Sequence, residues 1–251
     1  MTGDTTAIGR HSLCAYGEIA WHRLGLAALE VPSFEDEGTL WWRTVAVSPV
    51  YFAAITIRPN PRALPADLAG GRIRDTFGDY DGDALPGWTA TPADPWMWRE
   101  PAPVADVAVD GLEIDTAVNP DEVWVFERTA VRAAGGDDAL AAHPPFSIHG
   151  RESGQVPGLR LILGKLDGRP VGTAVAARWA GGVCITGVTV VPEARGRRVG
   201  SALTAAALRW APGVPASLSA SALGYHVYER LGFERVEAAP GRGTWDWTPP
   251  A

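Results

Sequence analysis

The sequence predicts an α/β fold, and two features of its second half support this class. Apolar, β-branched runs at residues 159–166, 170–179 and 183–191 are separated by the tight turns Asp167-Gly168 and Ala180-Gly181-Gly182, which is typical of a β-meander. A helical pattern then begins near Val199 and follows directly on a loop rich in glycine and arginine.

A third feature is a connector that divides the chain. Residues 99–111 are rich in Pro, Ala and Asp and have little helical periodicity. The chain has 251 residues, enough for one large domain or two of roughly 100 to 130 residues. We therefore expect two modules, residues 1–105 and residues 106–251.

Before the connector the local signals are weak. Residues 41–57 resemble β-structure interrupted at Ser48-Pro49, and residues 63–77 resemble a helix with a break at Gly70-Gly71. The eleven tryptophans, six of which lie in this first half, are expected to fill the core or to line an apolar groove.

After the connector the signals are clearer. Residues 111–117 alternate like a short strand, and residues 119–136 form a helical pattern that starts at Asn119-Pro120 and stops at glycine. Residues 231–247 and 85–99 each contain a glycine-aromatic pair followed by Trp-x-Trp. This echo is either a coincidence or the trace of two similar modules in tandem.

Composition and charge exclude several classes of function. No run approaches the ~18 apolar residues of a membrane helix, and the N-terminus lacks the apolar core of a signal peptide, so we expect a cytoplasmic protein. A net charge of −7 disfavours nucleic acid or an anionic membrane as the main partner. The two cysteines, Cys14 and Cys184, lie far apart and indicate neither a disulfide framework nor a metal site.

The loop before the predicted helix has the composition of a phosphate site. The first amides of a helix lack hydrogen-bond partners within it and lie at the positive end of the helix dipole. A phosphate placed there accepts hydrogen bonds from these amides and is attracted by the dipole. Gly196 and Gly200 allow the backbone to approach such a group closely, and Arg195, Arg197 and Arg198 add positive charge. We therefore expect this loop to bind a pyrophosphate.

Other interpretations of the loop are weaker. A P-loop requires a lysine directly after its second glycine, but Ser201 follows Gly200 here. A Rossmann loop belongs to a βαβ unit, whereas this loop follows a meander. A solvated connection whose arginines only maintain solubility is the remaining alternative.

Residues 187–204, GVTVVPEARGRRVGSALT, resemble the acetyl-CoA motif of the GCN5-related N-acetyltransferase (GNAT) superfamily. The family pattern Arg/Gln-x-x-Gly-x-Gly/Ala falls on Arg195, Arg198 and Gly200, with an arginine in place of the first glycine. That arginine either crowds the pyrophosphate or adds a charge to it. Downstream, residues 221–236 resemble the family segment in which a tyrosine precedes Glu-Arg-Leu-Gly-Phe.

The resemblance covers about residues 110–248 and implies a GNAT fold with acetyl-CoA as cosubstrate. The first half resembles the divergent N-terminal module of tandem GNAT proteins. The implied site lies where the fourth strand, residues 183–191, separates from the fifth, about residues 216–219. The backbone of Val188, Thr189 and Val190 is expected to contact the pantetheine arm, and Ser221 the cofactor arm. The other expected cofactor contacts come from the loop and the first helical turn: Arg195, Gly196, Arg197, Arg198, Val199, Gly200 and Ser201.

The resemblance also assigns a general acid. Tyr228 stands at the family's position for the group that protonates the departing thiolate. The helical spacing of Leu223, Val227 and Leu231 predicts a buried stripe, with Tyr228 about 100° away from it. A tyrosine packed at a helix edge is the structural alternative.

The general base is left open by the sequence. An ammonium with a pKa near 10.4 must lose a proton before it attacks. Glu152 and His149 are equally good candidates for the base, because their segment borders the acceptor pocket in this superfamily. Glu127 and Glu193 are weaker candidates. A chain of water molecules with no single base is as good an explanation as either of the first two residues. The sequence therefore predicts an N-acetyltransferase that acts on a small-molecule primary amine, or else a non-catalytic acyl-CoA-binding sensor.

Overall fold

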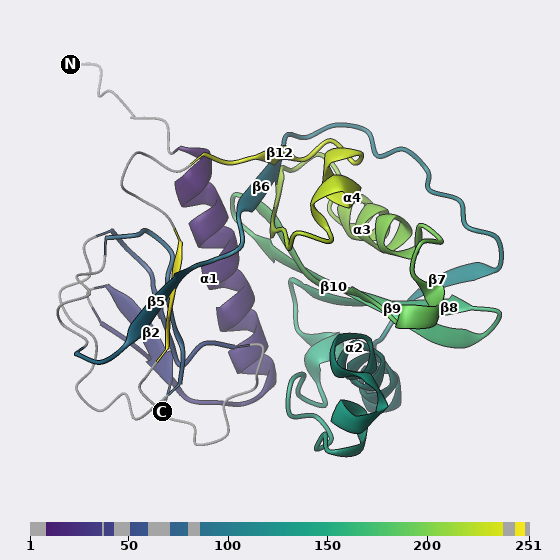
Figure 1. Cartoon of the computed structure of the whole chain (residues 1–251), viewed down its shortest axis with the longest axis horizontal. Coiled ribbons are helices and arrows are strands. Elements are labelled where there is room, and N and C mark those ends of the chain that lie inside the picture. Colours follow the sequence, from purple (N-terminus) through teal and green to yellow (C-terminus); the bar gives the residue numbers. More distant parts are fainter. Residues whose placement is uncertain are drawn as a thin grey trace.

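The protein is described by a computed structural model for residues 9–36, 38–42, 51–59, 71–79, 86–237 and 244–248. Two mixed sheets lie on either side of one long helix, α1 (Arg10–Ala28), as Figure 1 shows. The six-stranded sheet has the order β1-β2-β3-β4-β13-β5, and the seven-stranded sheet has the order β12-β6-β11-β10-β9-β8-β7.

The smaller sheet is built from short strands. They are β1 (Ser33–Glu35), β2 (Thr39–Trp42), β3 (Ala54–Thr56), β4 (Ile73–Asp75), β5 (Thr89–Pro92) and β13 (Trp245–Thr248). The prediction of β-structure within residues 41–57 is confirmed at β2 and β3, while Ser48-Pro49 lies outside the described residues.

The helix predicted over residues 63–77 is wrong in its described part. Residues 73–75 form β4, which pairs in parallel with β3 and antiparallel with β13. The start of that predicted helix and Gly70 lie outside the described residues. Pairing with strands distant in sequence, one of them about 170 residues away, overrides the local pattern.

The strands predicted after the connector lie in the larger sheet. Its strands are β6 (Trp96–Arg99), β7 (Leu112–Thr116), β8 (Leu159–Leu166), β9 (Arg169–Trp179), β10 (Gly182–Val190), β11 (Ala216–Ser219) and β12 (Glu234–Arg235). The predicted meander is β8-β9-β10, and its first turn places Asp167 and Gly168 at positive φ, 49° and 76°. No helix or strand lies between Arg99 and Leu112, as expected for a connector.

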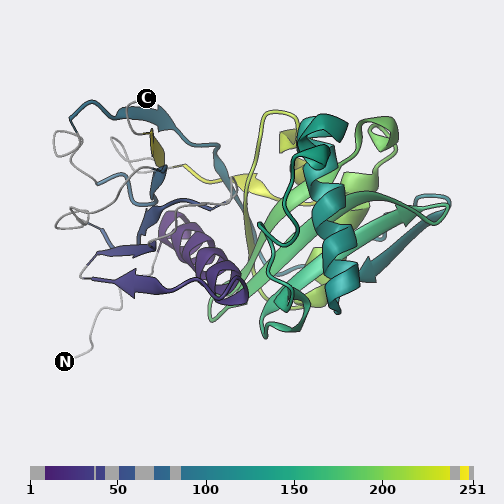
Figure 2. The same ribbon diagram turned by 90° about the horizontal axis from the view of Figure 1, so that it is seen from below.

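Helices cover both faces of this sheet. α2 (Pro120–Ala141) lies on one face, and α3 (Val199–Trp210) and α4 (Tyr225–Glu229) lie on the other (Figure 2). Two short 3-10 turns lie at Ser153–Gln155 and Pro192–Ala194. Asn119 caps α2 in a capping box with Glu122, which confirms the start signal. The glycine stop is a kink at Gly136 (φ 76°), after which a second helical piece runs to Ala141.

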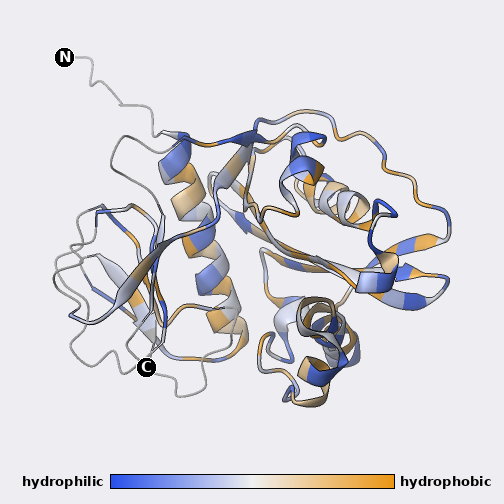
Figure 3. Cartoon of the chain, viewed as in Figure 1, coloured by the Kyte–Doolittle hydropathy of each residue, from blue (hydrophilic) through white to orange (hydrophobic). Residues whose placement is uncertain are grey.

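α1 is buried on two sides, which ties the sheets together. Its buried residues form two rows, one toward each sheet, and apolar bands recur along its length (Figure 3). One continuous core joins α1 to Ile55 of the smaller sheet and to Leu161 and Val175 of the larger one. A second core fills the space between the larger sheet and α3.

The two Trp-x-Trp strands are exchanged between the sheets. β6, from the first half, lies between β11 and β12, while β13, from the end of the chain, lies between β4 and β5. The pairings match in sense: β3-β4 and β10-β11 are parallel, and each exchanged strand is antiparallel to both of its neighbours. The first and second halves of the chain therefore each supply a strand to the sheet built mainly by the other half, and the boundary expected near residue 105 stays a prediction.

Candidate functional site

The centre of the site is the point where β10 leaves β11. The two strands pair only over Val183–Ile185 and Ala216–Leu218, although β10 continues to Val190. A β-bulge between Thr186 and Thr189, with Gly187 at φ 58°, bends β10 at the same point. The Thr173 hydroxyl holds the bulge, because it donates to the Gly187 carbonyl at 3.1 Å and lies 2.7 Å from the Thr189 hydroxyl.

The separation leaves one edge of β10 without a strand partner. Val188, Thr189 and Val190 lie beyond the last residue paired with β11, and Thr189 and Val190 pair with β9 on their other side. Their outer backbone groups can accept an extended ligand as an added strand.

The glycine and arginine loop follows this edge and leads into α3. Gly196 (φ 76°) and Arg198 (φ 63°, ψ 11°) both adopt left-handed backbone, and Arg198 is the N-cap of α3. The amides of Val199, Gly200 and Ser201 precede the first helical hydrogen bond, from the Ala202 N–H to the Arg198 carbonyl. They form a set of donors at the positive end of the helix.

Gly200 leaves space that the protein does not fill. A Cβ at this position would meet only Val190 and Val188, at 3.7 and 4.0 Å, which is ordinary contact. The fold therefore tolerates a side chain at Gly200, whereas a ligand lying against the helix would not. At Gly196 the reason for glycine is the backbone conformation, since a Cβ there would contact nothing within 4 Å.

The three arginines of the loop differ in their surroundings. The Arg195 guanidinium donates to the carbonyls of Val190 (3.0 Å) and Ala133 (2.9 Å), so its side chain ties the loop to β10 and α2. Arg197 and Arg198 are exposed, and neither forms an ion pair within the described part of the chain. Glu193, one of the weaker candidates for the base, pairs with Arg132 at 2.7 Å.

Tyr228 is buried, but the expected helical stripe is wrong. Leu223 is 91% exposed, whereas Tyr228 is 8% exposed and belongs to the same core as Ile185 and Phe233. α4 begins only at Tyr225, so Leu223 lies in the preceding turn and does not share the helical spacing. Burial raises the pKa of Tyr228 to about 12, so its hydroxyl stays protonated and can donate.

Ser221 lies at the start of the α4 turn. Its hydroxyl accepts from the Gly224 N–H at 3.3 Å, and its carbonyl accepts from Gly224 and Tyr225. A Cβ added to Gly224 would lie 2.9 Å from the Tyr228 ring, so this glycine allows the ring to lie close over the turn.

The candidates for the base lie in different environments. Glu152 is exposed and accepts from the Gln155 amide at 2.8 Å. His149 is buried at 4% exposure, and burial lowers its pKa to about 3. Glu127 is fully buried and accepts from His143 Nε2 and from the N–H groups of residues 147–149, so it organises this loop.

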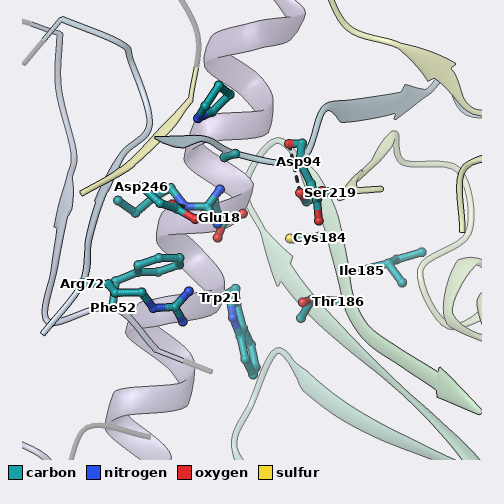
Figure 4. Close-up of a pocket in the computed structure, with 13 residues that line it drawn as sticks. Glu18, Trp21, Phe52, Arg72, Asp94, Cys184, Ile185, Thr186, Ser219 and Asp246 are labelled. Atoms are coloured by element: carbon teal, nitrogen blue, oxygen red, sulfur yellow. Dashed lines mark hydrogen bonds and ion pairs between the residues drawn. The ribbon is translucent and has the colours of Figure 1, made fainter. Parts of the chain in front are cut away.

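Two adjoining cavities reach the β10 bulge. An apolar one of about 500 Å³ lies between α2 and β10 and includes His149, Thr186 and Gly187. A polar one of about 360 Å³ lies between the two sheets and extends from Glu18 and Trp21 of α1 to Cys184, Thr186 and Ser219 (Figure 4). Trp21 and Thr186 line both.

The second cavity contains side chains that the sequence did not single out. Glu18, Arg72 and Asp246 come from α1, from the residue before β4 and from β13, so no local motif joins them. Cys184 lines the same cavity, and burial raises the pKa of its thiol well above the usual value, so it is a neutral thiol and not a nucleophile.

Two kinds of feature are absent from the described residues. No helix among them is long and apolar enough to cross a membrane. No group of three or more His, Cys, Asp or Glu side chains in the described ranges is placed to hold a metal ion.

Comparison with known proteins identifies this architecture. A GCN5-related N-acetyltransferase from Kribbella flavida superposes with a TM-score of 0.62 at 18% identity, covering 98% of this chain and 97% of that one. A functionally unknown conserved protein from Staphylococcus epidermidis superposes with a TM-score of 0.58 at 14% identity, covering 89% and 96%. A GCN5-related N-acetyltransferase-like protein from Streptococcus suis gives 0.51 at 11% identity, covering 90% and 92%.

Among curated proteins, none matches the sequence significantly. A family model of the acetyltransferase (GNAT) domain matches residues 157–235, which run from the start of β8 to the end of β12 and include the strand separation, the glycine and arginine loop and Tyr228. Residues 157–235 therefore match the sequence pattern of an acetyltransferase (GNAT) domain, and the superposed structures share the fold of the whole chain.

Proposed function

We propose that the protein transfers the acetyl group of acetyl-CoA to the primary amine of a small molecule by direct attack. The observation that carries this proposal is the separation of β10 from β11 beside a helix N-terminus with unpaired amides. An open strand edge suits the amide groups of a pantetheine arm, and the helix N-terminus suits a pyrophosphate.

The described residues fit acetyl-CoA. The pyrophosphate would lie over Gly200 and the first amides of α3, where a Cβ would otherwise occupy the space. Arg197 and Arg198 would add charge, while Arg195 would act by holding the loop. The pantetheine arm would pair with the backbone of Val188–Val190, which directs the thioester toward Ile185 and Thr186.

Tyr228 would donate the proton that the departing thiolate requires. Its hydroxyl is protonated at neutral pH, and it makes no hydrogen bond within the described part of the chain. The amine nitrogen forms the new C–N bond, the C–S bond breaks, and the thiolate sulfur takes the tyrosine proton. A base must first remove a proton from the acceptor's ammonium.

The two residues predicted as bases, Glu152 and His149, differ in whether they line a cavity at the site. Glu152 is exposed and lines neither cavity, whereas His149 lines the apolar cavity beside the β10 bulge. A pKa of about 3 makes His149 a weak base, and its Nδ1 has no hydrogen-bond partner among the described residues. We therefore propose that His149 contacts the acceptor as a neutral hydrogen-bonding group.

A tandem origin for the two halves belongs to the same proposal. The matching sense of the strand pairings and the exchanged Trp-x-Trp strands support a divergent GNAT-like module in the first half. Its role would be to close the acceptor side of the site, since α1 and β4 line the polar cavity. The cytoplasmic location expected from the sequence stays a prediction.

The test is thiol release from acetyl-CoA with a panel of amines, for the wild type and for Tyr228→Phe. The substitution removes one hydroxyl and keeps the ring, so folding and CoA affinity should change little, while kcat falls by about 10²–10⁴-fold. Tyr225→Phe is the matched control, because it makes the same chemical change one turn away on α4.

Two outcomes would contradict this function. A fall in kcat of less than about threefold for Tyr228→Phe, with product release shown not to limit the rate, would leave water as the proton source. Binding of CoA without thiol release on any amine would favour the alternative, a non-catalytic acyl-CoA sensor.

A further inference from the structure

The Glu18 carboxylate lies at the junction of the two sheets because of the residue before it. A Cβ added to Gly17 would meet the Ser217 hydroxyl at 2.7 Å and Cys184 Cβ at 3.4 Å, so glycine allows α1 to lie directly against β10 and β11. At roughly 100° per residue, Glu18 falls between the two buried rows of α1. Its side chain therefore extends into the cavity between the sheets (Figure 4).

This carboxylate is largely withdrawn from water, and no lysine or arginine among the described residues pairs with it. Its side chain is only 13% exposed, and the nearest basic nitrogen is His22 Nδ1, 4.0 Å from Oε1. Burial lowers the pKa of His22, so that ring is neutral at pH 7. No lysine or arginine of the described ranges forms an ion pair with Glu18. A carboxylate that is mostly withdrawn from water is stabilised by a cation beside it, and the open cavity leaves space for a cationic ligand.

Cationic side chains lie on the opposite wall of the cavity. Arg74 is matched by Asp246, with 2.8 Å between Nε and Oδ1. Arg72 lies over the Phe52 ring, 4.8 Å from its centroid, and its side chain is exposed. Figure 4 shows Arg72 and Phe52 on one side of Glu18, with Cys184, Thr186 and Ser219 on the other. A guanidinium in this position suits a carboxylate.

The cavity also reaches the reacting centre. Ile185 and Thr186, where β10 leaves β11, line it together with Ser219 at the end of β11. Its volume of about 360 Å³ is within the range of small-molecule sites.

We propose that this cavity binds an acceptor that carries both a primary amine and a carboxylate, with Glu18 receiving the ammonium and Arg72 the carboxylate. This rests on the proposed acetyl transfer and names its substrate class. Glu18 takes one proton from the ammonium, the freed lone pair forms the C–N bond to the acetyl carbon, and the C–S bond breaks with its electron pair on sulfur. The thiolate takes the Tyr228 proton, and the second proton that leaves the nitrogen restores the phenol. Glu18 is then the base, a role that neither Glu152 nor His149 fills.

The experiment compares amino acids with their carboxamides. The α- and ω-amino acids and the matching carboxamides are assayed for thiol release from acetyl-CoA. The carboxamide of an α-amino acid has the less basic amine, so a preference for the acid cannot come from the fraction of free amine. We expect kcat/KM for the best acid to exceed that of its carboxamide by about tenfold or more.

Two substitutions then test recognition of the carboxylate and of the ammonium of the acceptor one at a time. Arg72→Gln should abolish the preference by raising KM for the acid about tenfold, with the carboxamide unaffected. Glu18→Gln should lower kcat for acid and carboxamide alike, because the amide cannot take the proton of the ammonium. The other titratable and charged groups at this cavity, His22, Arg72, Arg74, Asp94, Cys184 and Asp246, are retained in that variant. Arg23→Gln and Glu35→Gln are the controls, because these residues form an exposed pair on the same half of the molecule.

A binding measurement makes the result independent of turnover. Calorimetric titration of the CoA-saturated protein with the preferred amino acid should show binding that Arg72→Gln and Glu18→Gln each weaken about tenfold. Equal turnover of acid and carboxamide, with both variants like the wild type, would overturn this inference while leaving acetyl transfer intact. Absence of turnover with every amine would overturn the proposed function, and absence of amino-acid binding as well would overturn both.

Discussion

Arg198 offers a test in which backbone conformation and charge can be separated. It occupies left-handed backbone at the N-cap of α3, where the superfamily motif usually has glycine. The left-handed backbone destabilises the folded state by roughly 1–2 kcal/mol for any residue with a Cβ, and a glycine avoids this cost. Glycine is also more flexible in the unfolded chain, which lowers the stability of the folded state by about 0.5–1 kcal/mol. Arg198→Gly should therefore raise the free energy of unfolding by about 0.5–1 kcal/mol.

Arg198→Ala is the matched variant for charge. It removes the guanidinium and keeps the Cβ that disfavours this backbone, so its stability should stay near that of the wild type. The difference between the glycine and alanine variants, about 0.5–1 kcal/mol, corresponds to about 1–4 °C in Tm for a chain of this size. Urea and thermal unfolding of both proteins measure it, and a difference below about 0.3 kcal/mol would refute the conformational reasoning.

CoA titration of the same variants measures the charge. If the guanidinium lies beside the phosphates, both variants should lose about fivefold to tenfold in CoA affinity, and less at high salt. Arg209→Ala, at the exposed far end of α3, should leave affinity unchanged. Tighter binding by Arg198→Gly alone would mean that the side chain crowds the pyrophosphate, and unchanged affinity in both variants would remove Arg198 from the site.

Three further predictions concern α2 and the loop at residues 147–149 that it supports. Because the pKa of buried His149 is about 3, the unfolded chain takes up a proton below pH 6.5 that the folded chain does not. Stability should therefore fall between pH 7 and pH 5, and urea unfolding at both values should show that His149→Asn removes about 2 kcal/mol of that fall. Asn119→Ala removes the capping-box acceptor of α2 and should cost about 1 kcal/mol in urea unfolding, whereas Asn119→Ser should restore most of it. Glu127→Gln replaces one acceptor oxygen by an amide donor, which then faces either the Ser147 N–H or those of Ile148 and His149, and should cost about 1–3 kcal/mol by the same measurement. A neutral result would mean that the loop at residues 147–149 has other acceptors.

The elements that the sequence predicted well are those formed by neighbours in the chain. The meander β8-β9-β10 depends on alternation and on tight turns such as Asp167-Gly168. The start of α2 depends on a cap three residues from its partner, Asn119 with Glu122. Each of these signals is complete within a few residues, so no knowledge of distant contacts is required.

The elements that the sequence predicted poorly depend on distant partners. Residues 73–75 resemble a helix in isolation and form β4 because β3 and β13 lie on either side. The stripe predicted at Leu223 fails because α4 has only five residues and begins after it. In both cases the tertiary neighbours set the outcome, and a local period could not reveal them.

The residues proposed to hold acetyl-CoA could be predicted without a structure, since the open edge of β10, the glycine and arginine loop and the first turn of α3 are consecutive in the chain. The residues proposed to hold the acceptor could not, because tertiary contacts bring them together. Glu18, Arg72 and Asp246 are separated by more than fifty residues from one another and meet because β13 is inserted into the first sheet and α1 packs on both sheets. The physical reason is that a charged side chain acquires its role from the groups that face it, and here those groups are brought together by strand exchange and by the close approach of α1 at Gly17.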